Sequence, residues 1–150
     1  MSTATLYSPR TNDYVQAEHY RITGPATPST AKLARDSVRA VLAVTRRPRL
    51  IDAARVCVSD AVAHVLPLMS GPVLTVDMSV HPSRVIISVG DACRDSRSSR
   101  RTMRREMDAE PVLRLLCRLT HAAGVTRTWN NGRIATQVWF ELHNAGAVHG

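Results

Sequence analysis

The chain has 150 residues, a length typical of one domain that buries most of its apolar surface without disulfides. Hydrophobic residues make up 44% of it, which excludes a disordered protein, and apolar runs such as residues 40–44 are too short to span a bilayer. The net charge is +8. Six arginines against one aspartate, Asp95, supply about five of these charges between positions 94 and 105.

The first half of the chain predicts one strand and two helices. Residues 17–22 alternate as an edge strand does, and Thr27 caps a helix that starts at Pro28 and ends near residue 45. The second helix spans residues 50–66, and its apolar side chains cover more than half of its surface, so we expect it to be the most buried helix. The first helix is expected to bury Leu33, Ala34, Val38, Val41 and Leu42.

The second half predicts two hairpins around a third helix. Residues 74–80 and 84–89 alternate on either side of a turn at 81–83, and this hairpin ends at Gly90 and Asp91. A helix at 109–123 ends at Gly124, and strands at 125–129 and 133–142 flank a turn at 130–132. The helix is expected to direct Val112, Leu115, Leu116, Leu119 and Ala122 toward a core.

This order of elements predicts an α+β two-layer sandwich, in which about three helices cover one face of a mixed, mostly antiparallel sheet. We expect one domain at 17–142, between a flexible N-terminal tail at 1–16 and a C-terminal tail at 143–150. Residues 91–108 form an arginine-rich lid loop within it. Neither an export signal nor a membrane segment is expected, which favours a cytoplasmic location.

A polar stripe on the second helix points to a ligand site. Val56, Asp60 and His64 are spaced four residues apart and share one face of a helix that otherwise has the pattern of a core element. Asp91 follows at the end of a strand. The alternatives are structural: Asp60 and His64 satisfy each other as an i, i+4 pair, and Asp91 caps a turn.

The order of elements, together with four motifs, resembles the GHKL (Bergerat-fold, histidine-kinase-like) ATPase domain. The resemblance covers residues 20–142. Within this family, the chain is most similar to small bacterial regulators of the anti-sigma-factor serine kinase type, which bind ATP and Mg²⁺. The motifs are the stretch from Val56 to His64, the hairpin ending in Gly90-Asp91, the helix ending in Ala123-Gly124-Val125, and the strand Val138-Trp139-Phe140-Glu141-Leu142.

The family's functional motifs are only partly kept. In its E-x-x-x-N helix motif, Val56 stands at the position of the glutamate base, and Asp60 stands at that of the asparagine that holds Mg²⁺, so Asp60 remains a metal ligand candidate. Asp91 matches the aspartate that accepts the adenine amino group. The resemblance also implies that His64 and Gln137 line the nucleotide site.

The glycines expected in that family are missing. Neither glycine of the D-x-G-x-G motif follows Asp91, and Glu110 and Pro111 stand where a glycine-rich segment would cradle the phosphates. Proline removes a backbone N–H donor and glutamate repels phosphate, so this end of a nucleotide site is disabled.

The remaining charged and sulfur side chains have simpler interpretations. The loop after Asp91 carries six arginines: Arg94, Arg97, Arg100, Arg101, Arg104 and Arg105. They are expected to form a solvated lid, a surface that binds an acidic protein, or a contact with nucleotide phosphates. A contact with nucleic acid is the least favoured alternative. Cys57 and Cys117 lie on apolar faces of predicted helices and are expected to act as small hydrophobic residues, and Cys93 is a redox candidate only through its arginine neighbours. We expect the scattered histidines to contact solvent rather than a metal: His19, His81, His121, His143 and His149.

Three functions follow from these patterns. The leading one is a degenerate GHKL ATPase-like regulator, a pseudokinase that controls transcription or development by binding a protein partner: a sigma factor, an anti-sigma antagonist or its own copy as a homodimer. Catalysis is not expected with Val56 at the base position. The alternatives are an ATP-dependent protein serine kinase that uses Asp60 and Asp91, and a basic nucleic-acid-binding regulator.

Overall fold

The computed structural model describes residues 17–91, 111–130 and 132–144. The N-terminal tail, the six loop arginines, Cys93 and His149 lie outside the described residues. Along the chain the elements are β1 (Glu18–Pro25), α3 (Pro28–Val44), α4 (Ile51–Val65), β2 (Val73–Val80), β3 (Arg84–Asp91), α6 (Pro111–Leu119), β4 (Ala122–Asn130) and β5 (Arg133–His143). Two short 3₁₀ turns, η1 (Pro48–Leu50) and η2 (Leu66–Leu68), flank α4.

The strands form one sheet in the order β1-β2-β3-β5-β4, and each neighbouring pair is antiparallel. The α+β class is therefore confirmed, but the expectation of a mixed sheet is wrong. The connection through α6 makes β3 and β4 run in the same direction. Because β5 returns from β4 as a hairpin and inserts between them, these two parallel strands never pair.

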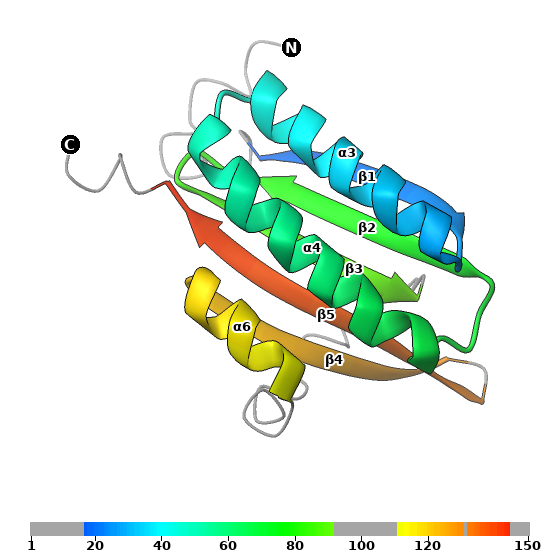
Figure 1. Ribbon diagram of the computed structural model, residues 1–150. Coiled ribbons are helices and arrows are strands. Elements are labelled where there is room, and N and C mark those ends of the chain that lie inside the picture. Colours follow the sequence, from blue (N-terminus) through cyan, green and yellow to red (C-terminus); the bar gives the residue numbers. More distant parts are fainter. Residues whose placement is uncertain (1–16, 92–110, 131, 145–150) are drawn as a thin grey trace, which may run out of the picture.

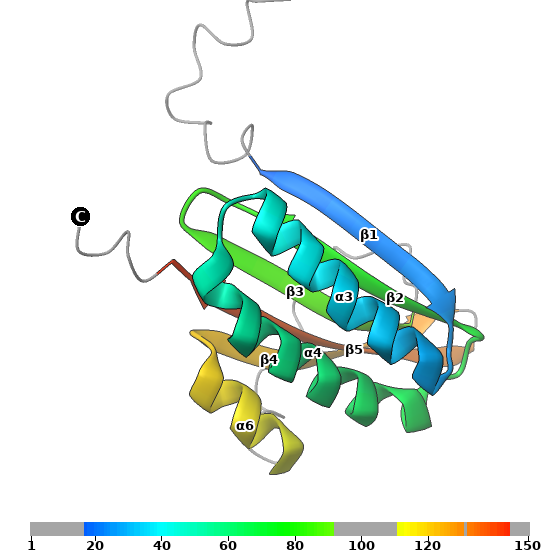
Figure 2. The ribbon, with the colours of Figure 1, turned by 45° about the horizontal axis from the view of Figure 1, so that its top comes forward.

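The helices α3, α4 and α6 lie on one face of the sheet, as Figures 1 and 2 show from two directions. Alternate strand residues point into the layer between helices and sheet, and Met78, Ile87 and Phe140 from three neighbouring strands are almost completely buried there. In the described part of the chain, no helix is both long and apolar enough to cross a membrane.

The two long helices follow the predicted pattern except at their edges. Every fourth residue of α3 is buried, namely Thr30, Ala34, Val38 and Leu42. Leu33 is 58% exposed, so its predicted burial is wrong: it lies beside this row, where the helix turns toward solvent. Thr27 makes no side-chain capping bond; the hydroxyl of Thr30 donates to the carbonyl of Pro25 instead (2.6 Å).

The end of α6 is the main error in the predicted elements. The helix stops at Leu119, where the hydroxyl of Thr120 donates to the carbonyl of Leu116, and β4 has begun by Ala122. The predicted helix to residue 123 is wrong because pairing with β5 takes over: the N–H of His121 already donates to the carbonyl of Glu141 (2.8 Å).

This shift also changes the roles of residues near that helix end. Gly124 lies within β4 opposite Trp139, and a Cβ on Gly124 would lie 2.9 Å from the indole ring, so glycine serves close packing there rather than a helix stop. Leu115 and Leu119 are each 39% exposed, so their predicted burial is wrong, whereas Leu116 is fully buried.

Candidate functional site

Two segments that carry predicted site residues, the end of α4 and the end of β3, lie at one end of the molecule (Figure 1). The chain leaves the C-terminal end of α4 through η2 and reaches Ser70 and Gly71, whose backbone N–H groups contact Asp91 at the end of β3. In Figure 1 the last turns of α4 and the arrowhead of β3 lie at the same end. The fold thus brings the end of α4, which carries His64, toward Asp91.

Asp91 is a buried structural centre of this end. Asp91 is only 4% exposed. Its carboxylate accepts hydrogen bonds from the backbone N–H groups of Gly71 (3.2 Å), Thr136 (3.4 Å) and Ser70 (3.5 Å). These bonds join the loop after α4 to β5 across the end of β3. The turn-capping alternative for Asp91 accounts for this geometry, and adenine recognition stays a prediction.

Gln137 belongs to the same network. Its amide nitrogen donates to the backbone carbonyl of Asp91 (2.9 Å), and its side-chain oxygen accepts from the hydroxyl of Ser88 (3.3 Å). Gly90 lies opposite Gln137 in the sheet, and a Cβ on Gly90 would collide with the carbonyl oxygen of Thr136. The sheet is therefore packed tightly around the point where an adenine acceptor was predicted.

The stripe on α4 lies on the flank of the helix. Val56 is 44% exposed, and Asp60 and His64 are half-buried, whereas the sheet-facing positions Cys57 and Val58 are fully buried. Burial, and to a smaller extent the charge of Asp60, raises the pKa of the Cys57 thiol to about 12, so this cysteine is a protonated core residue. Magnesium binding by Asp60 stays a prediction.

Exposed apolar side chains lie beside the Asp91 network. Trp129 on β4 and Ile134 on β5 face each other across the hairpin and are 72% and 45% exposed. The carbonyl of Ile134 accepts the hydroxyl of Ser70 (3.1 Å), which places Ile134 against the loop that follows η2. Leu68, the last residue of η2, is 44% exposed.

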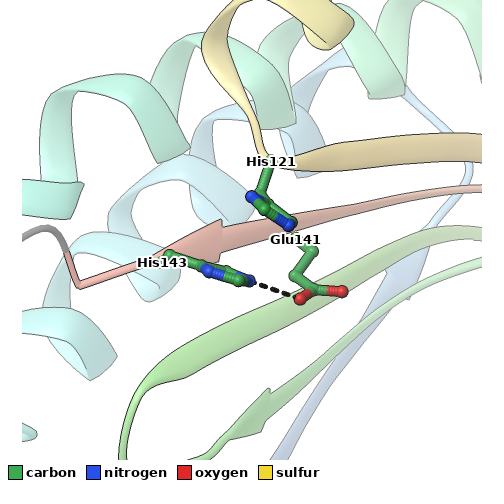
Figure 3. Close-up of side chains that lie close together, drawn as sticks. All are labelled: His121, Glu141 and His143. Atoms are coloured by element: carbon green, nitrogen blue, oxygen red, sulfur yellow. Dashed lines mark hydrogen bonds and ion pairs between the residues drawn. The ribbon is translucent and has the colours of Figure 1, made fainter. Parts of the chain in front are cut away.

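A second group of chemically active side chains was missed by the sequence analysis. Glu141 and His143 on β5 and His121 just before β4 gather at the opposite end of the same hairpin (Figure 3), and one possible ligand atom from each lies within 4.8 Å of the others. We call these three residues the His-Glu-His cluster. The Nε2–H of His143 donates to Oε2 of Glu141 (2.6 Å), and the two imidazole rings stack with centroids 3.8 Å apart.

The register of the hairpin brings the backbone of His121 to this cluster. Ala122 pairs with Glu141, so His121, which precedes β4, is level with Leu142 and lies between Glu141 and His143 along β5. Strand alternation would direct His121 to the face of Leu142, so its side-chain contact with His143 reflects its position outside β4. Because the third helix was extended to residue 123, His121 was assigned to a helix and the contact was not foreseen. His121 is exposed, as expected, but the two histidines also contact each other, and His143 contacts Glu141.

Glu141 lies in a positive environment. Its side chain is 15% exposed, and Nη1 of Arg84 on β3 lies 3.6 Å from the same Oε2 that accepts from His143. Burial raises the pKa of Glu141, but the hydrogen bond from His143 and the charges of Arg84 and the two histidines outweigh burial and hold the pKa below its ordinary value. The carboxylate is therefore ionised at neutral pH.

No protein-family model and no curated protein sequence matches this chain.

Proposed function

We propose that this protein is a GHKL-like regulatory protein that acts in transcriptional or developmental control by binding a protein partner, with weak or no ATP hydrolysis. The observation that carries the proposal is the state of Asp91. Its carboxylate is buried and already accepts three backbone N–H groups, so the adenine amino group of a nucleotide would have to displace one of them or share the remaining lone pair.

The residue at the base position supports the same conclusion. Val56 has no group that could orient or deprotonate an attacking hydroxyl, and it is 44% exposed on the flank of α4. An α+β fold with helices on one face of the sheet fits the GHKL resemblance, but the antiparallel sheet departs from the mixed sheet expected with it, and a fold hosts many functions. The loss of chemistry at Val56 therefore counts for more than the architecture.

The surface beside Asp91 supports binding to a protein. Trp129 is 72% exposed and pairs with the exposed Ile134, and tryptophan is among the residues that most often dominate the energy of protein interfaces. The sequence that follows Asp91 carries six arginines, which favours a partner with an acidic surface. A sigma factor or an antagonist domain with an acidic surface would be such a partner. A second copy of the chain, which itself carries a net charge of +8, would bind through the exposed apolar side chains instead.

Nucleotide titration of the full chain tests this proposal. We expect no binding heat in calorimetry and no thermal shift when ATP and Mg²⁺ are added, and the Asp60→Ala variant should behave as the wild type does. ATP binding that Asp60→Ala abolishes, together with phosphorylation of a serine on a partner, would show that the protein is a kinase and overturn the proposal.

A separate measurement addresses the binding surface. If the partner is a second copy, sedimentation equilibrium should show a concentration-dependent dimer that Trp129→Ser weakens by at least tenfold. The matched control is Val44→Ser, which changes a side chain that is 78% exposed at the end of α3. Equal weakening by both variants would argue against a surface centred on Trp129.

A further inference from the structure

We propose that His121, Glu141 and His143 bind a divalent transition-metal ion of the Zn²⁺ class. This site is separate from the residues used in the proposed function, since it lies at the other end of the β4–β5 hairpin.

The set of donor atoms matches the chemistry of such an ion. Zn²⁺ is bound in proteins by imidazole nitrogens and carboxylate oxygens, and two histidines with one glutamate form a known three-ligand set. Hard cations such as Mg²⁺ prefer sites made of oxygen atoms alone, so two imidazoles among three ligands favour a transition metal over Mg²⁺ or Ca²⁺.

The backbone holds the three donors close together before any ion arrives. Glu141 and His143 are two residues apart on β5 and therefore lie on the same face of the sheet. His121 is fixed next to them by its backbone bond to Glu141, and the three ligand atoms already lie within 4.8 Å of one another. Little chain entropy remains to be lost when they close around one ion.

Small side-chain movements convert the hydrogen-bonded cluster into a coordination site. When an ion binds, the proton on Nε2 of His143 would move to Nδ1, and the freed lone pair of Nε2 would bind the ion beside Oε2 of Glu141. These two atoms would separate from 2.6 Å to about 3.3 Å, the spacing of tetrahedral ligands about 2.0 Å from Zn²⁺. The stacked rings are within 18° of parallel, so one must rotate before both lone pairs point at the ion. His121 is exposed, which leaves it room to do so.

The surroundings of Glu141 also suit this role. Its side chain is 15% exposed and Arg84 lies 3.6 Å from Oε2, so the carboxylate is held in place from the side of β3. Such outer contacts orient the carboxylate ligands of metal sites. Three protein ligands leave a fourth position for water on the exposed side of His121.

Zinc titration of the full-length protein tests the inference. The chain is purified without a histidine tag, treated with a chelator and titrated with ZnCl₂ in a calorimeter, and we expect one ion per cluster. Replacing a residue that only orients a metal ligand typically lowers the affinity about 10–100-fold. His121 and Glu141 would bind the ion directly, so His121→Gln and Glu141→Gln should each lower the Zn²⁺ affinity by at least that much. His121→Gln changes an exposed side chain and is expected to leave the fold intact.

The control variant is His19→Gln, which changes an exposed histidine on β1 outside the cluster. Co²⁺ serves as a second probe, because coordination by imidazole and carboxylate gives visible absorption that should vanish in His121→Gln and persist in His19→Gln. Absence of Zn²⁺ binding by the wild type, or an equal loss of affinity in the control, would overturn the proposal and show that the cluster is an ion pair only. The titration contains no nucleotide or partner, so its outcome is independent of the proposed function.

Discussion

Replacement of Asp91 by asparagine separates a structural role of this carboxylate from a ligand-binding role. The carboxylate uses both oxygens, one for Gly71 and the other for Ser70 and Thr136. Asparagine has nearly the same shape but only one acceptor oxygen, so its NH₂ group must face at least one backbone N–H donor. A structural carboxylate therefore predicts lower stability even without any ligand.

The size of the effect follows from the bonds that are lost. Hydrogen bonds to a charged group contribute about 1.5–3 kcal/mol each at good geometry, and those of Asp91 are long at 3.2–3.5 Å, so about 1 kcal/mol each is appropriate. Asp91→Asn loses one or two of them and turns its NH₂ group toward the same one or two donors, which amounts to about 2 kcal/mol. Asp91→Ala leaves all three N–H groups without this acceptor and should cost about 4 kcal/mol.

Urea unfolding followed by circular dichroism at constant m-value measures these losses. The control is Asp77→Asn, which removes an exposed ion pair with Arg21 and should cost less than about 1 kcal/mol. If Asp91→Asn stays within about 0.5 kcal/mol of the wild type, the three backbone bonds do not stabilise the fold and the structural interpretation of Asp91 is refuted.

Three further variants test the backbone and the core. Arg46 is a non-glycine residue with φ of 64°, so Arg46→Gly should raise the unfolding free energy by about 0.5–1 kcal/mol; a loss of stability in urea unfolding would contradict this. Gly90→Ala forces a Cβ against the carbonyl of Thr136 and should cost more than about 3 kcal/mol, unless the β3–β5 pairing differs from that described. Cys57 keeps its proton in the folded state up to pH about 12, whereas the unfolded thiol loses its proton near pH 9. The stability advantage of the wild type over Cys57→Ala should therefore shrink between about pH 8 and pH 10. A stability difference that does not change over this range would count against the raised pKa.

Local periodicity was enough to identify the elements but not their ends. The alternation in β2 and β3 and the four-residue spacing in α3 were predicted because each depends on neighbours along the chain. The end of α6 was misplaced because Ala122 and Ala123 suit a helix locally. Their pairing with β5, a contact between distant residues, decides that they form a strand.

The candidate sites show the same division. The spacing of Val56, Asp60 and His64 on one helix was visible in the sequence, and so was a valine where the GHKL resemblance would require a glutamate. The partners of Asp91 come from Ser70, Gly71 and Thr136, which are 20 to 45 residues away and contribute only backbone groups. Backbone donors have no residue-type signature, so no motif could have revealed them.

The sequence by itself determined the α+β class, the helix that carries Asp60 and the valine at position 56 of that helix, because each depends on residue type and local spacing. Tertiary structure alone decided that the sheet is wholly antiparallel, that Asp91 is occupied by backbone bonds, and that His121 meets Glu141 and His143. The physical reason is register: pairing between strands brings together residues whose separation along the chain carries no periodic signal.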